Sequence, residues 1–202
     1  MSASVPSRPV RADAERSVAR ILEAARVVLA DDPTASMERI ADEAGVGRAT
    51  VHRRFASRKT LLETLCNQLD DQYLRALQEA KVDTAPPLVA LYRVTERVME
   101  LKLGNRSVLD AVVSALPGRD SHLSAEVQER AEQLFARLHA AGAITAENPA
   151  WCLRLYLAIF DAVHHTPAGA PELAGAADDV TARTNLLVTT VLRALGGEPP
   201  AF

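Results

Sequence analysis

Residues 36–62 restrict the fold of this chain most, because they join two short helical patterns through a glycine turn. Apolar residues recur at helical spacing over 37–44 and predict one buried face, made by Met37, Ile40, Ala41 and Ala44. Ser36 stands where an N-cap belongs, and Gly45 follows where helices commonly end in a left-handed residue. The segment is therefore predicted to be a helix that stops sharply at a turn.

A second short helix is predicted from Arg48 to Phe55, opened by Gly47. Val51 and Phe55 lie four residues apart and make a narrow apolar edge, and Ala49 is small enough for close packing. Five basic residues and no acid lie between Arg48 and Lys59. A helix that buries few residues and displays many hydrogen-bond donors is suited to the major groove of DNA.

Charge is unevenly distributed, although the net charge of the 202 residues is only −3. Residues 1–65 carry 11 Lys and Arg against 9 Asp and Glu, a net charge of +2. Residues 66–202 carry 12 against 17, a net charge of −5. The basic residues are thus concentrated where a DNA groove would be met, and the local field matters more for binding than the total charge.

The sequence from Ala44 to Phe55, followed by Ser57-Arg58 and Leu61-Leu62, resembles the helix-turn-helix of the TetR family of bacterial transcriptional regulators. This resemblance is specific because several positions match in register over roughly residues 14–63. The remainder of the chain resembles the family in its length and its all-helical layout.

The resemblance implies that the second helix of the motif contacts DNA, although three positions depart from the family pattern. Gly47 replaces the usual Ser, and Arg54 replaces the usual His or Tyr. His52 replaces a Tyr that typically contacts a backbone phosphate, and a histidine still donates there with a shorter reach. The predicted DNA-binding residues are Ser36, Arg48, Ala49, Thr50, His52, Arg53, Arg54, Arg58 and Lys59.

The chain before this motif is predicted to contain an arm and one supporting helix. Residues 1–12 hold Ser, Pro and Arg without an apolar pattern, which is typical of a disordered arm. Asp13 is the expected cap of a helix that ends at Asp31-Asp32-Pro33. Together with the motif, this helix makes a predicted three-helix DNA-binding domain over residues 13–62.

Residues 63–202 are predicted to form a second helical domain for ligand binding and dimerisation. A long helix over about 58–81, capped by Ser57, leads into this domain. The whole chain is expected to be all-α with about nine helices, the last five near 87–102, 106–116, 122–140, 149–165 and 178–196.

The last two of these helices predict a subunit interface. Apolar residues leave little polar surface over 149–165, and they form a broad stripe over 178–196. A helix that is apolar nearly all round must be covered on every side, and a second copy of the chain is the natural cover. A fully intramolecular core is the alternative that the pattern leaves open. The family resemblance implies dimers formed through these two helices.

A small-molecule site is expected in the second domain, as the resemblance implies. Thr95 places a hydroxyl in an otherwise apolar row on helix 87–102, and such a site suits a largely apolar molecule with one or two hydrogen bonds. The predicted ligand-binding residues are Tyr92, Thr95, Met99, Phe135 and Trp151. An ordinary core role for each of them is the alternative.

Enzymatic, metal-binding and membrane classes fit the sequence poorly. Gly45 and Gly47 follow a helix and lack the third glycine of a dinucleotide loop, and no nucleophile with an orienting base is recognisable. The histidines lack ligand spacing, so neither a metal nor a cofactor is expected. The longest apolar run, Leu155–Phe160, is too short to span a bilayer, and Cys66 and Cys152 lack a CxxC pattern. We therefore expect a soluble cytoplasmic protein that is not an enzyme.

These observations predict a ligand-responsive transcriptional regulator. By resemblance, it would be a repressor that binds a palindromic operator as a homodimer and is released by a small effector. Two recognition helices related by a two-fold axis would fit successive major grooves, roughly 34–36 Å apart. The alternative is a helical dimer that binds ligands or proteins without recognising an operator.

Overall fold

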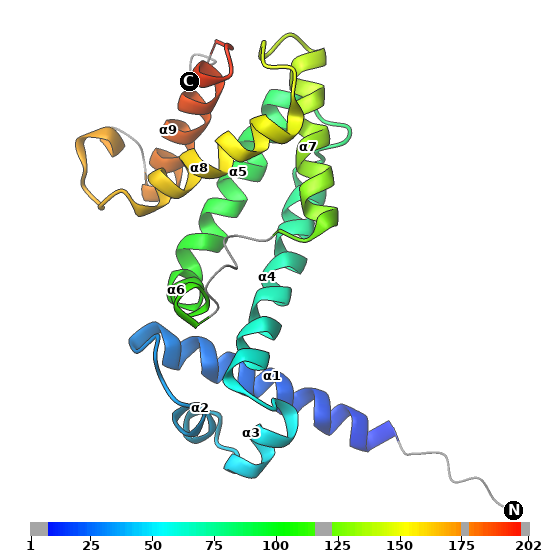
Figure 1. Cartoon of the computed structure of the whole chain (residues 1–202), viewed down its shortest axis with the longest axis vertical. Helices are drawn as coiled ribbons and strands as arrows, with labels where there is room; N and C mark the ends of the chain where they lie inside the picture. The colour runs from blue at the N-terminus through cyan, green and yellow to red at the C-terminus, as the bar shows by residue number, and fades with distance from the viewer. Residues whose placement is uncertain (1–7, 116–122, 175–177, 199–202) are drawn as a thin grey trace, which may run out of the picture. The chain divides into compact units, whose positions relative to one another are not determined.

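The computed structural model describes residues 8–115, 123–174 and 178–198, and it is all-α over these ranges (Figure 1). Nine α-helices and one short 3₁₀ helix lie within the described residues, and no strand occurs there. The chain divides into two compact units. One takes in Met1–Gln68 with Asn105–Asp120, and the other Leu69–Gly104 with Ser121–Phe202.

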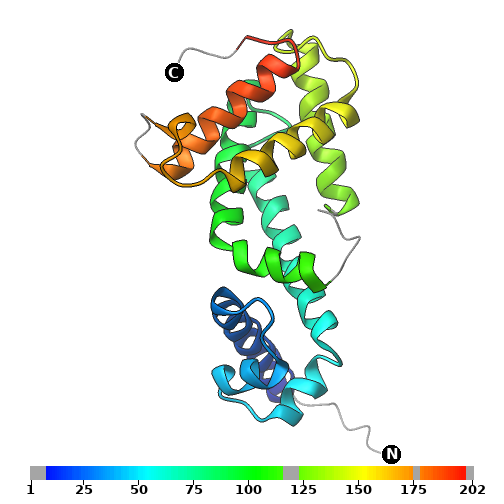
Figure 2. The same ribbon diagram turned by 60° about the vertical axis from the view of Figure 1, so that its left-hand side comes forward.

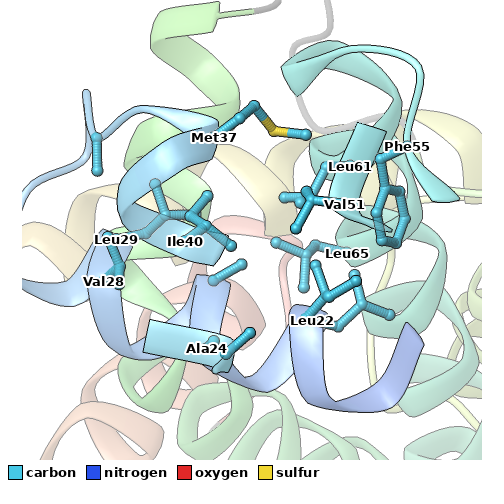
Figure 3. Close-up of a cluster of buried hydrophobic side chains, with 14 of the residues drawn as sticks. Leu22, Ala24, Val28, Leu29, Met37, Ile40, Val51, Phe55, Leu61 and Leu65 are labelled. Atoms are coloured by element: carbon cyan, nitrogen blue, oxygen red, sulfur yellow. The ribbon is translucent and has the colours of Figure 1, made fainter. Parts of the chain in front are cut away.

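The first unit is built from four helices and the start of a fifth. They are α1 (Arg8–Asp31), α2 (Met37–Ala44), α3 (Arg48–Arg54), α6 (Arg106–Ala115) and the first half of α4 (Arg58–Glu79). Their apolar faces meet in one core, to which α1, α2, α3 and α4 all contribute (Figure 3). Ile40 and Leu61 lie at its centre and are fully buried.

The short α2 helix has the ends that its sequence predicts. The Ser36 hydroxyl accepts a hydrogen bond from the Arg39 N–H at 3.3 Å. Gly45 adopts a left-handed conformation with φ of 61°, and its N–H donates to carbonyls of the last turn. Val46 then packs its partly buried side chain against the core. These features fix where the chain turns towards α3.

Two features of this unit differ from the prediction. The first helix begins at Arg8, so residues 8–12 of the expected arm are helical, and residues 1–7 lie outside the described residues. A proline in the first turn, here Pro9, is tolerated because the N–H groups there lack intrahelical acceptors. Asp13 therefore lies inside α1 and pairs with Arg16 instead of capping the helix.

The α6 helix is the second difference. Its bounds match the prediction closely, but it packs on α1 and belongs to the first unit, not to the second domain. Val108 and Ala111 are buried in the same core as α2 and α3. Helical periodicity reports which face of α6 is apolar but not which core covers that face.

The second unit is a helical bundle around α5 (Pro87–Gly104). It also contains the end of α4, α7 (Ala125–Ala140), α8 (Pro149–His165), the 3₁₀ helix η1 (Pro171–Leu173) and α9 (Asp179–Ala194). The α5 helix contacts α7, α8 and α9, and α8 also packs against both α7 and α9 (Figure 2). No helix of the described residues is long and apolar enough to cross a membrane.

We expect Ile40→Ala to lower the free energy of unfolding by about 2–5 kcal/mol, because it leaves a cavity in the core of the first unit. Val27→Ala is the matched control, since Val27 lies on the neighbouring α1 with half of its surface exposed (50%). The control should change stability by less than about 0.5 kcal/mol. Urea denaturation followed by circular dichroism measures both values, and equal losses would contradict the packing described here.

Candidate nucleic-acid interface

The α3 helix is held against the first unit by two side chains. Val51 and Phe55 are buried, as their spacing predicts. The helix opens at Gly47, whose carbonyl accepts hydrogen bonds from Thr50 N–H at 2.8 Å and Val51 N–H at 3.3 Å. A helix of seven residues has little stability of its own, so these two contacts fix its position.

The other sides of α3 form a cationic surface. Arg48, His52, Arg53 and Arg54 are exposed, and Thr50 is half-buried. Within the described residues, no ion pair engages the three α3 guanidinium groups, which leaves them available to bases and phosphates. Ala49 is exposed, and therefore does not make the close packing contact that its size suggests.

An acid lies near this cationic surface. The pKa of Glu38, on the first turn of α2, is lowered mainly by hydrogen bonds from its own backbone N–H and from Ser36, with smaller contributions from Arg48 and His52. Arg39, on the same helix, is directed instead to Asp31 and Asp32, with N···O distances of 3.6 and 3.5 Å. The charge of Arg39 is therefore partly neutralised by direct ion pairs, whereas the α3 arginines make none among the described residues and only Arg48 and His52 are near enough to Glu38 to affect its pKa.

The two basic residues at the start of α4 behave differently from each other. Lys59 is exposed and lies 4.0 Å from Glu63, a long contact for an ion pair. Arg58 is half-buried, and its guanidinium donates to the carbonyl of Ala35 at 3.1 Å and to the carbonyl of Pro33. Arg58 therefore connects α4 to the loop between α1 and α2.

A second arginine, which sequence reasoning missed, holds the other end of α2. Arg20 of α1 donates to the Ala44 carbonyl at 2.6 Å and to the Gly45 carbonyl at 3.4 Å. The last carbonyls of a helix lack intrahelical donors, and a nearby arginine satisfies them well. The glycine turn indicates a helix end, and therefore carbonyls of α2 that lack intrahelical donors. Nothing in the sequence indicates that Arg20 would donate to them.

Comparison with known proteins identifies the family. The model for bacterial regulatory proteins of the tetR family matches residues 21–65. The transcriptional repressor LfrR of Mycolicibacterium smegmatis is 35% identical over 149 residues, which cover 73% of this chain and 77% of LfrR. The chain belongs to the TetR family. It is therefore a helix-turn-helix transcriptional regulator.

Solved structures agree with this assignment. LfrR of Mycobacterium smegmatis in complex with proflavine aligns with a TM-score of 0.63 at 30% identity, over 88% of this chain and 94% of that one. The TetR-family regulator PfmR of Thermus thermophilus shares the fold, with a TM-score of 0.66 at 19% identity over 89% of this chain and all of PfmR (100%). Regulators of this family bind DNA and small molecules and act as dimers.

The second unit of this TetR-family chain brings together some of the predicted ligand-binding residues. The Thr95 hydroxyl lies 3.1 Å from the Tyr156 hydroxyl, and the ring of Phe135 meets the ring of Tyr156 edge-on at 5.8 Å. Met99 lies one helical turn after Thr95 on the same face of α5, and it is also buried. Tyr156 was missed because the sequence marks it only as one more apolar position of α8.

Two predicted ligand-binding residues lie apart from this cluster. The Tyr92 hydroxyl donates to Asn185 at 2.9 Å and so connects α5 to α9. Trp151 is 43% exposed on the surface of α8. A hollow of about 320 Å³ contains neither of them; it is lined by Gln72, Arg75, Ala76, Glu79, Arg97 and Leu101. Among the described residues, no cluster of three or more His, Cys, Asp or Glu could hold a metal ion.

The Arg58 contacts lead to a stability prediction. We expect Arg58→Ala to lower the free energy of unfolding by about 1.5–3 kcal/mol, because charged hydrogen bonds to two loop carbonyls are lost. Lys59→Ala is the matched control in the same turn and should change stability by less than about 0.5 kcal/mol. Urea denaturation measures the free energy of unfolding of both variants. An unchanged value for Arg58→Ala would contradict a stabilising role for the Arg58 contacts.

Proposed function

We propose that this regulator represses transcription by binding a palindromic operator as a homodimer, and that a small, largely apolar effector releases it. The observation that carries the proposal is the exposed, unpaired cationic surface of α3 on a buried anchor of Val51 and Phe55. Support for repression comes from LfrR, which is named as a repressor and shares 35% of its residues with the matched part of this chain.

The proposed DNA contacts divide by position on the motif. Thr50 and Arg53, one helical turn apart on α3, are proposed to reach base edges. The residues proposed to contact DNA phosphates are Arg48, His52, Arg54 and Lys59. Ser36 and Ala49 are proposed to lie beside the DNA backbone. Arg58 would act mainly by holding α4 to the loop before α2, since its guanidinium already has two carbonyl acceptors.

The proposed dimer interface is the face of α8 and α9 that their own unit leaves uncovered. On α8 this face carries Trp151, Leu155, Ala158 and Ala162, flanked by polar residues, and on α9 it carries Leu186 and Thr190. The small alanines allow a second helix to approach closely. Two such faces related by a two-fold axis would form a four-helix contact.

The proposed effector acts by linkage between the second unit and the DNA. An effector that binds better to a dimer whose recognition helices no longer match the two grooves must lower DNA affinity. LfrR, crystallised with proflavine, supports an effector with a ring system. Tyr92, Thr95, Met99 and Phe135 remain the proposed ligand contacts, with Tyr156 added because it hydrogen-bonds Thr95, whereas exposed Trp151 is assigned to the proposed dimer interface instead.

We expect Arg53→Ala and Arg54→Ala each to weaken operator binding by about 1–3 kcal/mol, or roughly tenfold to hundredfold. The operator is first recovered by selecting bound duplexes from genomic DNA, and affinity is then measured by fluorescence anisotropy at several salt concentrations. If Arg54 contacts a phosphate, its loss also lowers the salt dependence by about one counterion.

Arg93→Ala is the matched control, since Arg93 is an exposed arginine of α5 in the second unit. It should retain wild-type affinity and wild-type salt dependence. Should the wild-type protein select no duplex at low salt, the chain would instead be a ligand- or protein-binding dimer without operator recognition. Wild-type affinity in both α3 variants would remove this helix from the interface.

We expect Trp151→Asp to convert the dimer into monomers at micromolar concentration, because it replaces the largest apolar side chain of the proposed contact by a charge. Val89→Asp is the matched control, since Val89 is exposed to a similar extent (40%) but lies on α5. Sedimentation velocity gives the mass of each variant. A dimeric Trp151→Asp protein would place the interface elsewhere.

A further inference from the structure

Lys102 carries a positive charge at one end of the buried row between α5 and α8. It follows Thr95 and Met99 at helical spacing, so the three residues share one face of α5. Its ammonium lies 5.0 Å from the centre of the Phe160 ring, and Phe160 is only 1% exposed. Lys102 as a whole is half-buried, so its charge lies against an aromatic surface and is partly withdrawn from water.

This charge has no acidic partner among the described residues. None of the ion pairs found there includes Lys102. The acid that influences it, Asp161, has a side chain that is 71% exposed and lies 3.4 Å from His165. Burial lowers the pKa of Lys102, and Asp161 only partly opposes this effect. A desolvated charge without a counter-ion is unfavourable, and an anion beside it would relieve that cost.

The surroundings of Lys102 are aromatic. The Phe160 ring lies 5.9 Å from the Tyr156 ring, which in turn contacts Phe135. Thr95 and Tyr156 share one hydrogen bond between two hydroxyl groups, so one of the two O–H protons finds no acceptor within the described residues. Such a row offers aromatic contact, one free donor and a cation at one end.

A second charge in the interior of this unit is also positive. Arg183 of α9 is buried, and it donates to the Val163 carbonyl at 2.6 Å and pairs with the partly exposed Asp179 at 2.8 Å. No Asp or Glu side chain is buried among the described residues. Arg183 is thus compensated by Asp179 and by a backbone carbonyl, which leaves Lys102 as the charge of this region that lacks an ion pair among the described residues.

We propose that the second unit binds an aromatic effector with a negatively charged group, and that the Lys102 ammonium is the counter-ion of that group. This inference rests on the proposed effector response and names the chemical class of the effector. Met99, flexible and unbranched, is the side chain best suited to rearrange and make room for the aromatic body. Lys102 would then exchange its ring contact with Phe160 for a charge-assisted hydrogen bond.

The test compares three probes of one shape: 2-naphthoate, uncharged 2-naphthamide and cationic 2-naphthylmethylammonium. Calorimetric titration of the full-length protein without DNA measures their affinities directly. Because an ion pair out of water outweighs a neutral contact, we expect 2-naphthoate to bind at least about tenfold more tightly than 2-naphthamide. The cationic probe should bind most weakly.

Two variants assign this preference to Lys102. Lys102→Met keeps the length and apolar stem of the side chain without the charge, and it should bind 2-naphthoate and 2-naphthamide equally. Lys102→Arg keeps the charge and should retain the preference. Both variants should stay close to wild-type thermal stability, because in Lys102→Met the loss of the ring contact with Phe160 is offset by removal of a partly desolvated charge.

Three results would overturn the inference: no preference for 2-naphthoate in the wild type, no binding of any probe, or a preference that survives Lys102→Met. These outcomes are separable from the proposed function, because operator binding is measured without probe and probe binding without DNA. A protein that binds its operator but lacks the 2-naphthoate preference would remain a regulator whose effector is not an aromatic anion.

Discussion

The burial of Val51 and Phe55 is the contact on which the DNA-binding surface depends. The α3 helix has seven residues, fewer than an isolated helix needs to be stable in water. Three arginines on so short a helix also repel one another, which packing must offset. The core of α1, α2 and α4 supplies that packing, and α6 extends it through Val108 and Ala111. The cationic surface therefore exists only as part of a folded unit, which is why mutations in the core should affect DNA binding as well as stability.

Local signals predicted most helices well, because most boundaries are decided by nearby residues; the start of α1, which lies at Arg8 and not at Asp13, is the exception. The bounds of α2 follow from Ser36 and Gly45, and the start of α8 follows from Asn148 and Pro149, where the Asn148 side chain accepts a hydrogen bond from the Trp151 N–H at 3.0 Å. The assignment of α6 to the second domain failed because docking depends on distant partners. The roles of Arg20 and Arg58 were also out of reach, since each bridges more than 20 residues of sequence to a backbone carbonyl. Of the expected ligand residues, Thr95 and Phe135 both contact Tyr156. Trp151 is exposed, because it lies on the opposite face of α8.

The α8 helix explains why an apolar sequence predicts an interface without specifying it. Its apolar residues lie on two faces, and the structure assigns one of them to the interior through Tyr156, Phe160 and Val163. Trp151, the largest apolar residue left exposed, lies on the other face. A buried bundle and a covering partner require the same residue types, so composition alone could not separate them. Only the placement of α5, α7 and α9 shows which face remains to be covered.

The two arginine contacts at the ends of α2 bear on how an effector could alter DNA binding. The α4 helix contributes residues up to Gln68 to the first unit and residues from Leu69 to the second, so it is continuous between them. At its first turn, Arg58 holds the carbonyls of Pro33 and Ala35, and Arg20 holds the opposite end of α2 to α1. Hydrogen bonds are directional and weaken steeply once donor and acceptor lose their alignment. A small rotation of α4 therefore either moves the loop before α2 or breaks the Arg58 contact. Where the loop follows Arg58, α2 and α3 move with it, because they share one core and one glycine turn.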